Sequence, residues 1–151
     1  MRHAFLPLVL LLFPSVGFAQ STWYVDQSGA GDFTGIQQAI DDAQVVHGDT
    51  VIARDGIYFE NINFNGKAIA LKSENGPATT IIDGNQAGSA VTFDSGEGSS
   101  SVLEGFTVTN GSANEGGGMF CLSSSPTLID CMFTNNQALN SGGGIYGYQS
   151  S

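Results

Sequence analysis

Basic residues are scarce in this chain. Four Lys and Arg stand against 14 Asp and Glu, which gives a formal net charge of −10. Because nucleic-acid binding depends on neutralising phosphates with basic side chains, we expect no nucleic-acid partner. Long hydrophobic runs are also lacking, since no stretch approaches the roughly 18 apolar residues of a membrane-spanning helix. We therefore expect no transmembrane segment in these residues.

Cysteine and proline are rare as well, with two and four residues respectively. Cys121 and Cys131, with the distant His47, have neither the ligand number nor the spacing of a zinc site. A Cys121–Cys131 disulfide is a hypothesis that an oxidising compartment would allow. The alternative is that both are small buried residues on different strands. With 41% hydrophobic residues and 21 Gly, the composition predicts a core built from short segments, not disorder.

The chain begins with a pattern typical of a secretory signal. Arg2 and His3 precede an apolar run over residues 4–13. Gly17-Phe18-Ala19 then offers small residues at the two positions that a signal peptidase reads. We assign residues 1–19 to a signal peptide and expect export to an extracellular or outer-membrane surface location.

Residues 20–49 predict a strand followed by the only helix. Residues 23–25 form the expected strand, and Thr34 and Gln37 have the spacing of a capping box. An amphipathic pattern predicts a helix over residues 34–44. Its expected apolar face consists of Ile36, Ile40 and Ala43.

Residues 50–151 contain a repeat. The tract that begins Gly116-Gly117-Gly118 returns 26 residues later as Gly142-Gly143-Gly144, and the chain stops within that second copy. A direct repeat of this period indicates a solenoid, truncated in mid-repeat. Short β-branched and aromatic runs alternate with Gly, Asn and Ser throughout the region. The predicted strands are residues 50–53, 57–64, 68–72, 80–83, 90–93, 102–108, 119–122, 127–133 and 145–148.

These strands separate into two interleaved series, which predicts two parallel sheets with two strands per turn. Each strand is expected to pair with its equivalent one turn later, as Met119 with Ile145. An antiparallel sandwich is the alternative, because Asn-Gly turns such as Asn65-Gly66 and Asn110-Gly111 suit hairpins. The direct repeat favours the solenoid.

The repeats resemble those of right-handed parallel β-helix proteins that bacteria secrete, including polymorphic outer membrane proteins. The matching segments are Ser124-Ser-Pro-Thr127, Cys131-Met-Phe133-Thr-Asn-Asn136-Gln-Ala138 and Gly142-Gly-Gly-Ile-Tyr146. The segments Gly31-Asp-Phe-Thr-Gly-Ile-Gln-Gln-Ala-Ile40, Gly48-Asp-Thr-Val51 and Asp55-Gly-Ile-Tyr58 are similar to the opening of pectin-lyase-fold proteins, pectinesterases among them. The resemblance implies an all-β solenoid, a right-handed single-stranded parallel β-helix whose N-terminal end is closed by a short capping α-helix.

Glycine and asparagine are expected at the corners between strands. Both tolerate a left-handed backbone, and stacked Asn amides can bond from one turn to the next. A glycan contact is the alternative role for the asparagines. The predicted turn and ladder residues are Asn110, Asn135, Asn136, Gly116, Gly117, Gly118, Gly142, Gly143 and Gly144.

We assign no catalytic, cofactor-binding or metal-ligating residue. Lyases of the similar fold, the resemblance implies, use Arg or Lys as a base against calcium-bound uronate. Calcium is therefore the one ion considered, but it needs converging oxygen ligands. The candidate acids Asp83, Asp94, Glu97 and Glu104 are spaced singly. Arg54-Asp55 is expected to pair locally and His47 to lie in a solvated loop.

We expect a secreted or cell-surface bacterial β-helix repeat protein that acts as a non-catalytic adhesin-like or glycan-binding scaffold. Its partner would be an extracellular polysaccharide or a host cell surface. One alternative is a polysaccharide lyase or carbohydrate esterase whose catalytic residues lie C-terminal to this segment. Another is a structural stalk that carries a further domain. The aromatic residues considered for sugar stacking are Trp23, Tyr24, Tyr58, Phe59, Tyr146 and Tyr148, although core packing is expected for each.

Overall fold

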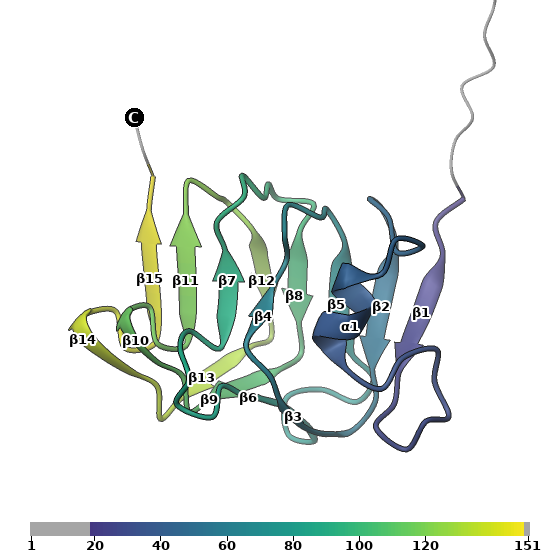
Figure 1. Cartoon of the computed structure of the whole chain (residues 1–151), viewed down its shortest axis with the longest axis horizontal. Helices are drawn as coiled ribbons and strands as arrows, with labels where there is room; N and C mark the ends of the chain where they lie inside the picture. The colour runs from purple at the N-terminus through teal and green to yellow at the C-terminus, as the bar shows by residue number, and fades with distance from the viewer. Residues whose placement is uncertain (1–18, 150–151) are drawn as a thin grey trace, which may run out of the picture.

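The structure, a computed structural model, describes residues 19–149. The predicted signal peptide therefore lies outside the described residues, except for Ala19. The described chain winds into a parallel β-solenoid of about five turns (Figure 1). Every strand pairing within it is parallel, so the predicted solenoid is confirmed and the antiparallel sandwich is wrong.

Three sheets form the faces of the solenoid. Sheet A contains β1 (Thr22–Val25), β2 (Thr50–Ala53), β5 (Ala70–Ser73), β8 (Val102–Glu104) and β12 (Thr127–Ile129). Sheet B contains β3 (Gly56–Phe59), β6 (Thr80–Asp83), β9 (Thr107–Thr109) and β13 (Met132–Thr134). Sheet C contains β4 (Ile62–Asn63), β7 (Val91–Phe93), β11 (Met119–Leu122) and β15 (Ile145–Tyr148). A two-stranded sheet D adds β10 (Ser112–Glu115) and β14 (Gln137–Ser141).

The prediction of two sheets is wrong, because each long predicted strand bends into two. Gly105, at φ 78°, separates β8 from β9, and Asp130, at φ 47°, separates β12 from β13. A left-handed residue turns the chain between strands, so three short strands fit into one turn. The repeat spacing predicts that residues 68–71 pair with 90–93, and residues 80–83 with 103–106. Both pairings are wrong, because β5 pairs with β8 in sheet A and β6 pairs with β9 in sheet B.

Like residues stack in columns inside the solenoid. In sheet C, Met119 pairs with Ile145 as predicted. The inward column of sheet A contains Val51, Leu71, Leu103 and Leu128. That of sheet B contains Tyr58, Ile82, Val108 and Phe133. Full burial of one aliphatic side chain contributes about 1.5–3 kcal/mol, so these columns are the main source of stability.

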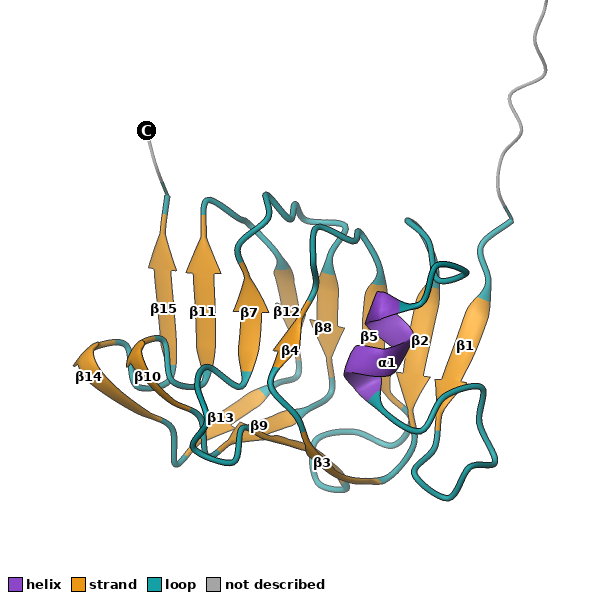
Figure 2. Cartoon of the chain, in the orientation of Figure 1, coloured by secondary structure: helices purple, strands orange, loops and turns teal. Residues whose placement is uncertain are grey.

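The single described helix, α1 (Ile36–Asp41), is shorter than the predicted helix (Figure 2). It packs against β1 and β4, and it buries Ile36, Ala39 and Ile40, whereas the predicted core residue Ala43 is exposed. The predicted cap is also wrong. The Glu60 carboxylate accepts bonds from the N–H groups of Ile36 (2.9 Å) and Gln37 (2.7 Å), because the first turn of a helix leaves these donors unpaired.

Gln37 has a different function from the predicted one. Its side-chain amide exchanges two hydrogen bonds with the backbone of Asn63, at 2.7 and 3.1 Å. The amide thus joins α1 to β4 in the way that a neighbouring strand would. The Thr34 hydroxyl and N–H both bond Gln38 instead of the helix backbone.

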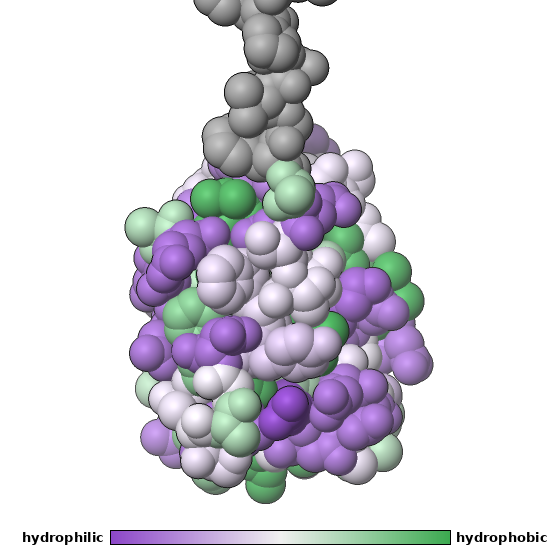
Figure 3. Space-filling model, turned by 90° about the vertical axis from the view of Figure 1, so that its right-hand side faces the viewer, coloured by the Kyte–Doolittle hydropathy of each residue, from purple (hydrophilic) through white to green (hydrophobic). Residues whose placement is uncertain are grey.

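The two ends of the solenoid differ in surface chemistry. Seen from the β1 side, the surface is mainly hydrophilic, with small separate hydrophobic areas (Figure 3). At the other end, β12, β13, β14 and β15 are the outermost strands of their sheets. Ile145 pairs with the buried Met119 and so faces inward, yet it is 45% exposed because no further strand of the described chain covers it. Leu139 in β14 is 84% exposed. Within residues 119–149 the only charged side chain is Asp130.

Candidate functional site

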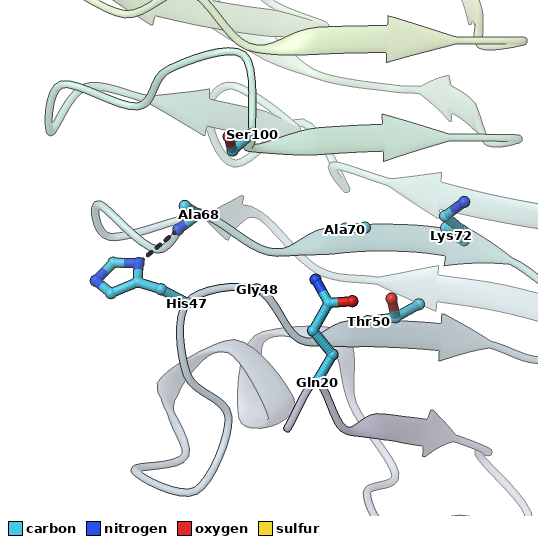
Figure 4. A pocket seen from close by; sticks show the side chains of 8 residues that line it. All are labelled: Gln20, His47, Gly48, Thr50, Ala68, Ala70, Lys72 and Ser100. Atoms are coloured by element: carbon cyan, nitrogen blue, oxygen red, sulfur yellow. Dashed lines mark hydrogen bonds between the residues drawn. The ribbon is translucent and has the colours of Figure 1, made fainter. Parts of the chain in front are cut away.

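A groove of about 490 Å³ crosses the outer face of sheet A (Figure 4). The surface is hollow there because the residues of its floor have small side chains. These are Ala70 in β5, and Gly48 and Ala68 in the turns before β2 and β5. We call this hollow the sheet A groove. It is lined by Gln20, His47, Gly48, Thr50, Ala68, Ala70, Lys72 and Ser100. No Asp or Glu lines it, although the chain has 14 of them.

His47 stands at one end of the groove and has a defined tautomer. Its Nδ1 accepts a hydrogen bond from the Ala68 N–H at 3.0 Å. Because an accepting nitrogen carries no proton, the neutral ring holds its proton on Nε2. Figure 4 shows this nitrogen on the side of the ring away from Ala68. The predicted loop position is correct, and the free ring nitrogen points away from the other residues that line the groove (Figure 4).

Lys72 stands at the opposite end of the groove (Figure 4). Its Nζ lies 2.8 Å from the Glu104 carboxylate, and both side chains are partly exposed. Such a surface ion pair contributes at most about 1 kcal/mol, so Lys72 can exchange Glu104 for a ligand at little cost. The other two basic residues of the described chain are engaged elsewhere, Arg54 with Asp26 and Lys67 with the carbonyls of Asp42 and Val45.

Between the two ends lie polar side chains without partners. The amide of Gln20 and the hydroxyls of Thr50 and Ser100 form no hydrogen bond with any described residue. Each can donate and accept. The groove therefore presents a row of donors and one ammonium group to an elongated polar ligand.

A second hollow, of about 460 Å³, lies at the corner where β6 and β9 end. We call it the corner hollow. It is lined by Phe59, Asp83, Asn85, Gln86 and Asn110. Of the predicted turn and ladder residues, only Asn110 lines it, together with Phe59 and Asp83, the sequence candidates for sugar stacking and for calcium respectively. The core packing expected for Phe59 is wrong, since the residue is 66% exposed; strand alternation alone does not show which side of a short strand is buried.

The predicted asparagines lie at corners. Asn110 and Asn135 have φ of 54° and 53°. The Asn110 amide donates to Asp83 at 2.8 Å. Asn136 accepts from the Gly111 N–H (2.8 Å) and donates to the Val108 carbonyl (2.9 Å), which joins consecutive turns.

The predicted glycines lie where strands of adjacent turns approach closely. Gly116 and Gly142 have φ of 62° and 68°. A Cβ on Gly117 would meet the Gln137 carbonyl oxygen, and one on Gly143 would lie 3.1 Å from the Asn136 carbonyl oxygen. Gly118 and Gly144 follow in the same two tracts, and Gly118 bonds the Gly143 carbonyl through its N–H.

Cys121 and Cys131 are free cysteines in the structure. Cys121 lies in β11 of sheet C, and Cys131 lies between β12 and β13. Burial raises the pKa of both thiols. A raised pKa lowers the fraction of reactive thiolate at neutral pH.

The acids considered for calcium do not converge. Glu97 is buried and accepts bonds from the N–H groups of Gly66 and Ser95. Asp83 bonds Asn85 and Asn110, whereas Glu104 pairs with Lys72. Asp94 bonds Asn63 and Ser95. Within residues 19–149, no three His, Cys, Asp or Glu side chains form a group that could hold a metal ion.

Arg54 is part of a separate charged cluster near β1. Its guanidinium lies 2.7 Å from the Asp26 carboxylate, 3.9 Å from Glu74 and over the ring of Tyr24. Hydrogen bonds from Ser28, together with Arg54, lower the pKa of Asp26 to about 2. Arg54 thus pairs with Asp26 from the preceding turn and not with its neighbour Asp55.

Comparison of the chain with protein-family models, with curated proteins and with solved structures gives no match. No helix of residues 19–149 is long and apolar enough to cross a membrane.

Proposed function

We propose that the chain is an exported, cell-surface or secreted β-helix that binds polysaccharide without cleaving it. We further propose the right-handed winding of pectin-lyase-like proteins, with α1 closing the N-terminal end. The observation that carries the proposed function is the sheet A groove, an open, elongated hollow with donors along its length and no lining carboxylate. Sugar units with carboxylate groups fit such a groove, because Lys72 supplies the charge and Gln20, Thr50 and Ser100 supply hydrogen bonds.

The sheet A groove carries a positive charge, from Lys72, whereas the chain as a whole is strongly negative. A net charge of −10 repels an acidic polymer at long range, and salt weakens this repulsion. Binding in the groove therefore depends on short-range contacts. We expect affinity for an acidic polysaccharide to change little, or to rise, when salt is added up to about physiological strength.

Affinity electrophoresis of the full chain tests the proposal, with polygalacturonate in the gel. The wild type is expected to be retarded, and Ala70→Gln, which fills the floor of the groove, is expected to abolish the retardation. Val102→Gln is the matched control, because Val102 pairs with Ala70 in the next strand and does not line the groove. Absence of retardation of the wild type would overturn the proposal. Release of shortened or unsaturated products would favour the lyase or esterase alternative.

A further inference from the structure

The corner hollow combines an exposed aromatic ring with fixed polar groups. Phe59 in β3 and Asp83 in β6 are direct partners across neighbouring strands. The residue before each of them, Tyr58 or Ile82, points inward and is fully buried. Because successive side chains of a strand alternate, Phe59 and Asp83 share the outer face of sheet B. An apolar ring and a carboxylate thus stand side by side at the mouth of one hollow.

The carboxylate of Asp83 is held in place from two sides. One oxygen accepts the Asn85 N–H at 2.8 Å, and the other accepts the Asn110 amide at 2.8 Å. Each oxygen keeps a second lone pair, so the group can still accept two hydroxyl protons. Asp83 is only 9% exposed, so a ligand reaches it only through the hollow.

Two further amides line the corner hollow. The side chains of Asn85 and Gln86 form no hydrogen bond with any described residue, and both are exposed. Their backbones have φ of 48° and 55°, so two consecutive residues other than glycine are left-handed. Asn tolerates this conformation, whereas in Gln86 it costs roughly 1–2 kcal/mol.

We propose that the corner hollow binds one unit of a neutral saccharide. The Phe59 ring packs against the C–H face of the sugar, since aromatic rings bury large apolar area with little loss of conformational freedom. Asp83 accepts two neighbouring hydroxyl groups, and Asn85, Gln86 and Asn110 bond the remaining oxygens. An acidic sugar fits poorly, because its carboxylate would approach that of Asp83.

This second site is independent of the sheet A groove. It lies on another face, it takes the opposite class of saccharide, and it contains no basic side chain. Either site can therefore fail without the other. Binding of acidic polymer tests the groove, and binding of neutral polymer tests the corner hollow.

The experiment is affinity electrophoresis of the full chain in gels that contain a neutral β-glucan, a galactomannan or a xylan. We expect retardation by at least one of them, weakened about tenfold or more by Phe59→Ala and by Gln86→Ala, the size of effect that loss of one stacking or bidentate contact gives. Tyr148→Ala removes an exposed aromatic ring from sheet C and is expected to leave the retardation unchanged. Ala70→Gln is also expected to leave it unchanged.

Circular dichroism of each variant verifies that the solenoid remains folded. Phe59 and Gln86 are exposed, so neither substitution removes a buried contact. No retardation by any of the three polymers, or equal retardation of the wild type and Phe59→Ala, would overturn this second site. Retardation by polygalacturonate alone would do the same and would leave the groove supported.

Discussion

Glu97 joins three successive turns of the solenoid through one buried carboxylate. It accepts hydrogen bonds from the Gly66 N–H (2.8 Å), the Ser95 N–H (2.9 Å) and the Ser124 hydroxyl (2.9 Å). These three donors belong to the same corner of consecutive turns, between sheets C and A. The side chain is 3% exposed. Replacing Glu97 with Gln keeps the shape and turns one acceptor oxygen into a donor.

The expected loss follows from this count of bonds. One buried donor loses its acceptor, which costs about 1–3 kcal/mol, and the other two bonds lose the strength that charge gives them. We expect Glu97→Gln to lower the free energy of unfolding by about 2–4 kcal/mol at neutral pH. Glu104→Gln is the control, because its partly exposed pair with Lys72 contributes at most about 1 kcal/mol.

Acid should reduce the difference between wild type and variant. Burial of Glu97 acts to raise its pKa, but the N–H and hydroxyl donors outweigh burial and hold the pKa below its ordinary value of 4.5. The unfolded chain then takes up this proton first as the pH falls. The stabilisation is complete above the unfolded pKa and is lost as the pH falls through the folded pKa.

Urea denaturation at pH 7 and near pH 3 measures both effects. The fluorescence of the single tryptophan, Trp23, and circular dichroism follow unfolding. The reasoning is refuted if Glu97→Gln lowers the free energy of unfolding by less than about 1 kcal/mol at pH 7, where Glu97 of the wild type is ionised and its hydrogen bonds are strongest. It is also refuted by a difference from the wild type that stays constant on acidification.

Two further predictions concern the last two turns. Gly118→Ala should destabilise the protein by about 1–3 kcal/mol, because the new Cβ would meet the Gly144 carbonyl oxygen. Gly144→Ala should change stability by less than about 0.5 kcal/mol, because the atom nearest to the new Cβ, Phe133 Cβ, would be 3.9 Å away. Equal effects of the two substitutions in thermal denaturation would contradict this. The outermost strand edge has few charges to prevent pairing with another copy, so we expect self-association that rises with concentration and decreases in Leu139→Lys. Sedimentation velocity that shows only monomer at all concentrations would contradict it.

The stacking of the solenoid was readable from the sequence because each turn repeats the pattern of the one before. The glycine tracts at residues 116–118 and 142–144 set the register that pairs Met119 with Ile145. These features depend on local chemistry and period, both of which a single sequence contains.

The number of faces was not readable in the same way. The long apolar runs of residues 102–108 and 127–133 look like single strands, and one left-handed residue in each divides them. Gly105 at such a point is an ordinary turn residue, but Asp130 adopts the same conformation with less sequence signal. A three-sided turn therefore followed only from the folded backbone.

The sequence by itself determined the parallel solenoid and the pairing of β11 with β15, because both follow from a repeat in which every turn contacts its neighbours. Only the tertiary structure decided the three-sided turn and the side-chain contacts at its corners and ends. It placed Glu60 at the start of α1, Glu97 in contact with three successive turns, and Phe59 beside Asp83. Such contacts join side chains that are far apart in the sequence, so no local pattern or period contains them.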